Sequence, residues 1–197
     1  GAPGAELFDR LWPEVSPLTL LDRFRARTIA RSLEGALALP GDIVECGAFQ
    51  GGMSLLMALV ARERGARKVV WICDSFEGLP EPDRTVDRRY AKGEFRGDLE
   101  RLERRIAELG LRDFCRVKKG WFRDTLGTFD PAQQFCFAHF DVDLCAPILE
   151  CFEAIHPLLS DGAPIVCDDY ADGSRGVMTA IDRWVERTGE VIFPGPA

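Results

Sequence analysis

The hydrophobic residues of this chain fall into two alternating patterns. Short, nearly continuous apolar runs predict five strands, at 42–46, 68–73, 114–118, 134–140 and 163–167, and a sixth strand at 190–193. Apolar residues at helical spacing predict helices at 51–64 and 98–110. They also predict a helix that begins at Pro147 and a helix around 177–185 that Ser174 caps.

This alternation predicts an α/β fold with right-handed crossovers, in which a mainly parallel central sheet carries helices on both faces. We expect one such domain over residues 41–197, preceded by an N-terminal helical extension over residues 1–40. Ligands bind such sheets outside the carboxyl ends of the strands. The positions to inspect are therefore Glu45, Asp74, Lys119, Asp141 and Asp168.

The segment 78–97 is long for a connection in a compact domain and is rich in Pro, Asp and Arg. Its length predicts a mobile lid or a substrate loop. The arginines between Asp83 and Arg96 could recognise an acidic substrate or belong to a solvated loop, and the pattern alone allows both.

Composition and charge narrow the class of protein. The net charge is −7 and the basic residues are scattered, so a nucleic acid is not an expected partner. No apolar run is long enough to cross a bilayer and no signal pattern opens the chain, which predicts a cytoplasmic protein that does not bind membranes. The seven cysteines form no CxxC pair and favour buried, reduced thiols over disulfides or zinc ligands.

The segment from Glu45 to Gly52 joins the first strand to the helix after it and has the spacing G-x-x-x-G-G. Its glycines allow a tight turn and a close approach by a ligand. A preceding acid suits a ligand that carries an ammonium group, although a plain turn explains the motif equally well. Asp74, at the end of the second strand, could accept both hydroxyls of a ribose or could cap a turn.

An acid set follows the fourth and fifth strands: Asp141, Asp143, Asp168 and Asp169. Neighbouring strands would bring these carboxylates to one edge, where Mg²⁺ or Ca²⁺ would relieve their repulsion. Solvated acids that cap the next elements are the alternative. His139 lies on the same side of its strand as Asp141 and is either a catalytic base or a hydrogen-bonded structural residue.

Five motifs occur in order between Gly41 and Trp184: GDIVECGAFQGG, WICDSFEGLPEPD, KKGWFRDTL, FDVDL and LLSDGAPIVCDDY. Together they resemble the macrocin O-methyltransferase family of sugar O-methyltransferases. The resemblance implies a class I methyltransferase fold that is Rossmann-like, S-adenosylmethionine as the cofactor, Mg²⁺ as a helper in substrate binding, and a homo-oligomer. Cys145 stands where this family usually has a tyrosine, and Gly162-Ala163 replaces the usual Gly-Gly.

The resemblance also implies roles for individual residues. The methionine part of the cofactor would lie against Glu45, Gly47, Gly51 and Gly52, with help from Met53 or Ser54. The ribose would meet Asp74 and Ser75, and the adenine would meet Gly120 and Trp121, although Trp121 could equally be a packing residue. The metal ligands would be Asp141, Asp168 and Asp169, with Asp141 also the base and His139 the other candidate for that role.

The expected function is methyl transfer to a hydroxyl of a small-molecule acceptor, and the family favours a sugar of a glycosylated natural product. A phenolic or peptidic hydroxyl, a non-catalytic cofactor-binding protein and an NAD(P)-dependent oxidoreductase are the alternatives.

Overall fold

A parallel sheet of five strands forms the centre of the protein. The computed structural model describes residues 3–170 and 175–192, and side chains from residue 6 onward. The sheet order is β3-β2-β1-β4-β5, and each neighbouring pair is parallel. Its strands are β1 (Asp42–Cys46), β2 (Val70–Asp74), β3 (Cys115–Lys119), β4 (Phe135–Phe140) and β5 (Ile165–Cys167). The five predicted strands are therefore confirmed.

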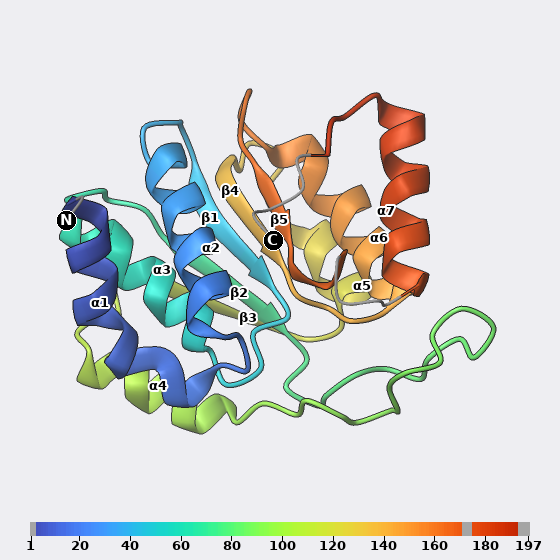
Figure 1. Cartoon of the computed structure of the whole chain (residues 1–197), viewed down its shortest axis with the longest axis horizontal. Coiled ribbons are helices and arrows are strands. Elements are labelled where there is room, and N and C mark those ends of the chain that lie inside the picture. Colours follow the sequence, from blue (N-terminus) through green and yellow to red (C-terminus); the bar gives the residue numbers. More distant parts are fainter. Residues whose placement is uncertain (1–2, 171–174, 193–197) are drawn as a thin grey trace.

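Helices cover both faces of the sheet (Figure 1), as the alternating pattern predicted. One face carries α1 (Pro3–Val15), the 3₁₀ helix η1 (Ser16–Leu18), α2 (Arg23–Ala36), α3 (Gly52–Glu63) and α4 (Leu99–Glu108). The opposite face carries α5 (Phe122–Thr125), η2 (Leu126–Thr128), α6 (Cys145–Ile155), η3 (His156–Leu158) and α7 (Arg175–Thr188). The short helix η4 (Asp168–Tyr170) follows β5. None of the helices within the described ranges has the length and apolar character needed to cross a bilayer.

Two expectations about element bounds need correction. Helix α6 begins at Cys145, so Pro147 lies inside its first turn, where a missing N–H is tolerated. The predicted strand at 190–193 is wrong for residues 190–192, which form no strand. The apolar pair there suggested a strand, yet Val191 is 69% exposed, and Ile192 packs against the core without belonging to a strand. Ser174 and Phe193 lie outside the described residues.

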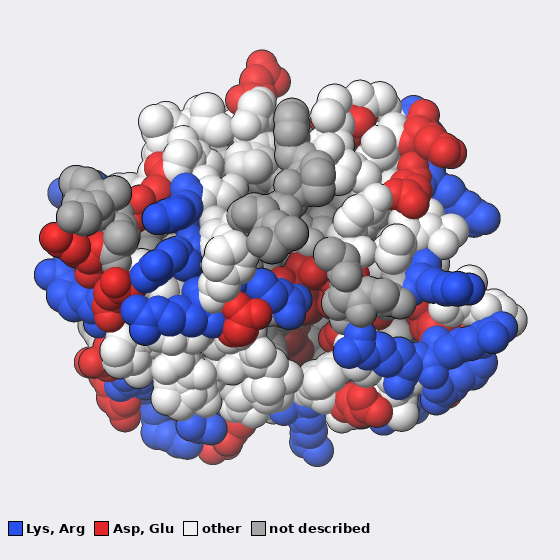
Figure 2. Space-filling model, in the orientation of Figure 1, with Lys and Arg blue, Asp and Glu red and all other residues white. Residues whose placement is uncertain are grey.

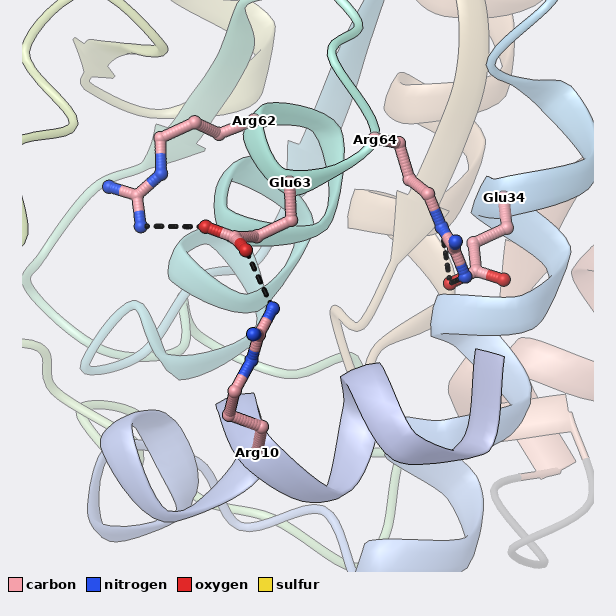
Figure 3. A network of polar contacts seen from close by, with 5 residues as sticks. All are labelled: Arg10, Glu34, Arg62, Glu63 and Arg64. Carbon is pink, nitrogen blue, oxygen red and sulfur yellow. Dashed lines mark hydrogen bonds and ion pairs between the residues drawn. The ribbon is translucent and has the colours of Figure 1, made fainter. Parts of the chain in front are cut away.

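The N-terminal helices pack against α3, with Phe8 and Leu33 among their buried residues. Arg10 of α1 pairs with Glu63 at 2.6 Å, and Arg64 pairs with Glu34 of α2 at 2.9 Å (Figure 3). Such exposed ion pairs add about 1 kcal/mol or less each, so the buried apolar contacts contribute most to this attachment.

The connection between β2 and α4, residues 75–98, contains no regular helix or strand and runs along the carboxyl ends of the strands (Figure 1). It folds back on itself, since Leu79 donates its N–H to the Glu94 carbonyl at 2.8 Å and accepts from Gly93 at 2.9 Å. Asp87 is buried and accepts the backbone N–H of Cys145 at the start of α6. A carboxylate at a helix N-terminus is favoured by the helix dipole, so Asp87 anchors this segment to the body of the protein.

Gly47, which follows β1, offers a direct test of the fold. Its φ is +85°, and a Cβ there would lie 1.8 Å from the Asp141 carbonyl oxygen. Gly47→Ala should therefore lower the free energy of unfolding by more than about 3 kcal/mol, measured by urea denaturation.

Gly65→Ala is the matched control for that variant. Gly65 also has a positive φ, +70°, but a Cβ there would meet nothing within 4 Å. It should cost only about 1–2 kcal/mol, the penalty of the left-handed backbone itself. Equal losses for the two variants would contradict the close contact at Gly47.

Candidate functional site

A cavity of about 340 Å³ lies at the carboxyl ends of the strands. Figure 2 shows acidic side chains inside this hollow and basic side chains around it. Most of the residues predicted as site residues line it: Glu45, Gly47, Met53, Asp74, Ser75, Gly120, Trp121, Asp141, Asp168 and Asp169. The remaining predicted residues, Gly51, Gly52, Ser54 and His139, are not among its lining residues.

Gly51 and Gly52 are required by packing within the chain. A Cβ on Gly51 would lie 2.3 Å from a methyl group of Leu102, and Gly51 has a φ of +84°. A Cβ on Gly52 would lie 2.7 Å from the carbonyl oxygen of Leu18. The two glycines thus let α4 and η1 approach the start of α3, while Gly47 faces the cavity.

Asp74 ties the glycine loop to the end of β2. One of its oxygens accepts the N–H groups of Ala48 at 2.8 Å and Phe49 at 3.1 Å, and the other accepts that of Phe76 at 2.6 Å. Burial raises the pKa of Asp74, and these three N–H groups oppose that rise only in part. A carboxylate offers about four acceptor positions, so roughly one is left for a ligand hydroxyl.

The same region contains strained backbone. Phe49 and Phe76 have φ values of +52° and +57°, which is unusual for bulky residues. Strain of this kind is found mainly at functional sites, where neighbouring contacts hold it in place. Here the carboxylate of Asp74 supplies those contacts to both residues.

Ser75 and Gly120 close the second side of the cavity. Ser75 donates its hydroxyl to the Gly78 carbonyl at 3.3 Å and accepts the N–H of Glu77 at 3.0 Å. Gly120 donates its N–H to the Asp74 carbonyl at 2.9 Å, which joins the ends of β2 and β3. Trp121 follows as the partly buried residue before α5.

A buried polar pair lies behind the cavity. Glu45 and His139 are opposite each other in β1 and β4, and His139 Nδ1 is 2.9 Å from a Glu45 oxygen. Ser54 donates its hydroxyl to the other Glu45 oxygen. Burial lowers the pKa of His139, but the hydrogen bond to Glu45 and the charges of nearby carboxylates raise it more, so it lies above its usual value. His139 is wholly buried, with no described partner for Nε2.

Three carboxylates converge beside the glycine loop, next to Gly47. Single oxygens of Asp141, Asp143 and Asp169 all lie within 4.8 Å of one another. Asp169 is buried and accepts the N–H groups of Val142 at 3.0 Å and Asp143 at 2.8 Å. Burial and the charge of Asp169 raise the pKa of Asp141 to about 8. Ionising all three carboxylates therefore costs electrostatic free energy, and a bound divalent cation would offset that cost.

Asp168 lines the same cavity but is paired with Arg25 of α2. Arg25 donates from Nε to one Asp168 oxygen at 3.0 Å and from a terminal nitrogen to the other. The sequence predicted Asp168 as a metal ligand and did not predict this ion pair. No motif marks Arg25, and 143 positions separate it from Asp168.

Sequence reasoning also missed two other contributions to the site. Thr19, Leu20 and Leu21, between η1 and α2, line the cavity. The anchoring role of Asp87 was missed as well, because an aspartate in an Arg-rich segment is usually exposed. Asp143 was recognised as part of the acid set, and its left-handed φ of +61° is one that aspartate tolerates well.

Comparison with known proteins adds independent findings. The family model for macrocin O-methyltransferase matches residues 9–190. One relative is the 8-demethyl-8-(2,3-dimethoxy-α-L-rhamnosyl)-tetracenomycin-C 4′-O-methyltransferase of Streptomyces olivaceus. It is 36% identical, over 87% of this chain and 70% of its own length. The demethyldecarbamoylnovobiocin O-methyltransferase of Streptomyces niveus is 31% identical, over 82% of this chain and 65% of its own. The chain thus spans about two thirds of the length of these relatives.

Solved structures of methyltransferases resemble this protein in fold. The O-methyltransferase NovP superposes with a TM-score of 0.81 at 27% identity, over 89% of this chain and 78% of that structure. The calicheamicin methyltransferase CalS11 superposes with a TM-score of 0.76 over 100% of this chain and 91% of its own, and at 20% identity it supports the fold alone. The chain has the class I methyltransferase fold, and it belongs to the macrocin O-methyltransferase family of O-methyltransferases.

Proposed function

We propose that this protein transfers the methyl group of S-adenosylmethionine to a hydroxyl of a small molecule, a sugar of a glycosylated natural product. One observation carries the proposal: the glycine loop with Asp74 and, beside it, the acid cluster line the same cavity. The glycine loop and Asp74 suit a nucleoside with an amino-acid tail, and the acid cluster suits an acceptor that must lose a proton. The relative named for a rhamnosyl-tetracenomycin supports a sugar acceptor.

The cofactor half of the cavity has a donor and acceptor pattern that fits S-adenosylmethionine, whose sulfonium supplies an electrophilic methyl group. We assign Glu45, Gly47 and Met53 to its methionine part, with Gly51, Gly52 and Ser54 shaping the loop. Asp74 and Ser75 are assigned to the ribose, and Gly120 and Trp121 to the adenine. The remaining acceptor position of Asp74 supports the ribose assignment.

Asp141 is the proposed base. It lines the cavity, and its carboxylate lies in the acid cluster beside the position proposed for the acceptor hydroxyl. Asp141 would accept the proton of the acceptor hydroxyl. A bound S-adenosylmethionine would supply the methyl group to that oxygen, with cleavage of its S–CH3 bond and release of S-adenosylhomocysteine. His139, the other candidate, lies behind Glu45 and is proposed to position that carboxylate.

We also propose a Mg²⁺ site at Asp141, Asp168 and Asp169. Their oxygens are of the type that hard cations prefer. Asp141 and Asp169 lie in one carboxylate cluster with Asp143, and Asp168, which is not part of that cluster, is assigned from the family resemblance. Mg²⁺ would lower the pKa of an acceptor hydroxyl. In this structure Arg25 forms an ion pair with Asp168. A bound cation would therefore either contact that carboxylate together with Arg25 or replace Arg25 there.

The remaining assignments concern the surroundings of the site. We propose that residues 1–40 act as a cap, since Leu20 and Arg25 already border the cavity. A homo-oligomer, a cytoplasmic location and the lack of nucleic-acid and membrane partners stay predictions.

Methyl transfer itself can be tested with S-adenosylmethionine labelled in the methyl group and a panel of rhamnosides and phenols. We expect label in a sugar hydroxyl and stabilisation by S-adenosylhomocysteine but not by NAD in a thermal-shift experiment. Stabilisation by NAD alone would overturn the proposal in favour of an oxidoreductase. Cofactor binding without transfer to any acceptor would leave a non-catalytic relative.

The metal assignment predicts a pattern among three isosteric variants. Mg²⁺ at 100 times its Kd should raise the midpoint of thermal unfolding by roughly 5–10 °C in the wild type. Asp168→Asn and Asp169→Asn should abolish this rise and lower turnover by about 10²-fold or more, while the affinity for S-adenosylhomocysteine stays within about threefold.

Asp143→Asn is the matched control, because it should keep both the rise and most of the turnover. A loss in Asp143→Asn with retention in Asp168→Asn would move the third ligand to Asp143. Undiminished, EDTA-insensitive activity in all three variants would contradict a metal role.

The raised pKa of Asp141 predicts a pH dependence of stability in EDTA. Between its ordinary value of 3.8 and about 8, the native state binds a proton that the unfolded chain releases. Stability should therefore fall as pH rises from 6 to 8, at up to about 1.4 kcal/mol per pH unit for this proton. His139, whose pKa is also raised, contributes with the same sign above its usual value of 6.5.

Urea denaturation at pH 6, 7 and 8 measures this slope. Asp141→Asn should flatten it, whereas Asp124→Asn at an exposed position should leave it unchanged. A wild-type slope equal to that of Asp141→Asn would show that Asp141 ionises normally in the folded protein.

A further inference from the structure

The segment 19–25 borders the cavity from the start of α3 to the end of β5. At one end Thr19 lies against α3, since a Cβ on Gly52 would be 2.8 Å from the Thr19 Cβ. At the other end Arg25 forms its ion pair with Asp168, which follows β5. Helix α2 begins within this segment, at the carboxyl ends of the strands (Figure 1). The segment is therefore a rim of the cavity that contacts both the cofactor side and the acid side.

This rim exposes two large apolar side chains. Leu20, which lines the cavity, is 67% exposed, and Phe24, in the first turn of α2, is 54% exposed. Val86 and Val191 are the other large apolar side chains exposed within the described ranges, and each lies alone in its segment. Exposed apolar side chains that gather beside a cavity mark an interaction site, whereas single ones need no explanation.

Hydrogen bonds hold the backbone of the rim. The hydroxyl of Thr19 accepts the N–H of Leu21 at 3.1 Å. Asp22 caps α2 and accepts the N–H groups of Phe24 at 2.7 Å and Arg25 at 2.9 Å. The exposed apolar side chains therefore extend from a preformed backbone, which lowers the entropy lost when a ligand binds them.

The volume of the cavity limits what can lie inside it. Its 340 Å³ is near the lower end of the range for single small-molecule sites, about 300–1,000 Å³. The proposed reaction places both a cofactor and an acceptor sugar there. The rest of a glycosylated acceptor must therefore lie outside, next to the acid cluster, and the ion pair between Arg25 and Asp168 places the rim at that point.

We infer that Leu20 and Phe24 bind an apolar aglycone, the non-sugar part of the acceptor, while its sugar reaches Asp141. The inference rests on the proposed function and adds the chemical character of the aglycone and the residues that select it. Burial of apolar surface is favourable roughly in proportion to its area, so an apolar aglycone gains affinity at this rim and a small one does not. The two side chains act on the choice of acceptor, while proton removal remains with Asp141.

Two glycosides that share one sugar test the rim by binding alone. With S-adenosylhomocysteine saturating, naphthyl rhamnoside should bind the wild type about tenfold or more tightly than methyl rhamnoside does, by isothermal titration calorimetry. Leu20→Ser/Phe24→Ser should bring the two Kd values within about threefold of each other. Equal Kd values in the wild type, no binding of naphthyl rhamnoside, or a preference that the double variant retains overturns the inference.

Val191→Ser is the matched control, because Val191 is also exposed and does not line the cavity. It should keep the wild-type preference, and an equal loss in this variant would contradict a role of the rim. Unchanged S-adenosylhomocysteine affinity and an unchanged urea midpoint confirm that the double variant is folded. Sedimentation velocity detects a different occupant. A changed assembly state of the double variant with a retained preference for naphthyl rhamnoside assigns the rim to a second copy of the chain and overturns the inference.

Kinetics separate this inference from the proposed function. With both rhamnosides as acceptors, the wild type should show a KM about tenfold lower for the naphthyl compound at similar kcat, and the double variant should lose that difference. Methylation of both compounds with equal KM overturns the inference while the proposed function stands. The expected binding preference without methylation of any hydroxyl contradicts the proposed function while the apolar rim stands.

Discussion

The close approach of the backbone at the ends of β1 and β4 is the constraint on which the site depends. Gly47 lies so near the Asp141 carbonyl that a single added carbon would collide with it. Together with the pairing of β1 and β4, this contact places the glycine loop directly beside the acid cluster in the lining of one cavity. A side chain at position 47 would push the loop away from Asp141, and the alignment of reacting groups on which the proposed reaction depends would be disturbed.

Buried and half-buried aspartates extend this arrangement by accepting backbone N–H groups. Asp74 holds the glycine loop against β2, and Asp169 holds the turn after β4. Asp87 does the same for the long connection at the start of α6. Each of these carboxylates therefore satisfies N–H groups that would otherwise be costly to bury, and each also faces the cavity. The same three side chains thus stabilise the fold and line the candidate site.

Negative charge is concentrated on one part of the site. The acid cluster lies at the ends of β4 and β5, and burial together with the charge of Asp169 raises the pKa of Asp141 to about 8. Arg25 offsets part of the negative charge by its ion pair with Asp168. A cation is therefore favoured at this end of the cavity.

The sequence by itself determined the alternation of strands and helices, the parallel sheet and the carboxyl-end residues Glu45, Asp74 and Asp141, because periodicity and strand ends are local features of the chain. The tertiary structure alone decided contacts between distant segments. It placed Arg25 on Asp168, buried Asp87 and set His139 behind Glu45. It also showed that residues 190–192 form no strand, since a strand needs a neighbour and an apolar run cannot supply one. Pairing, burial and charge neutralisation depend on which surfaces meet, and only the folded chain brings those surfaces together.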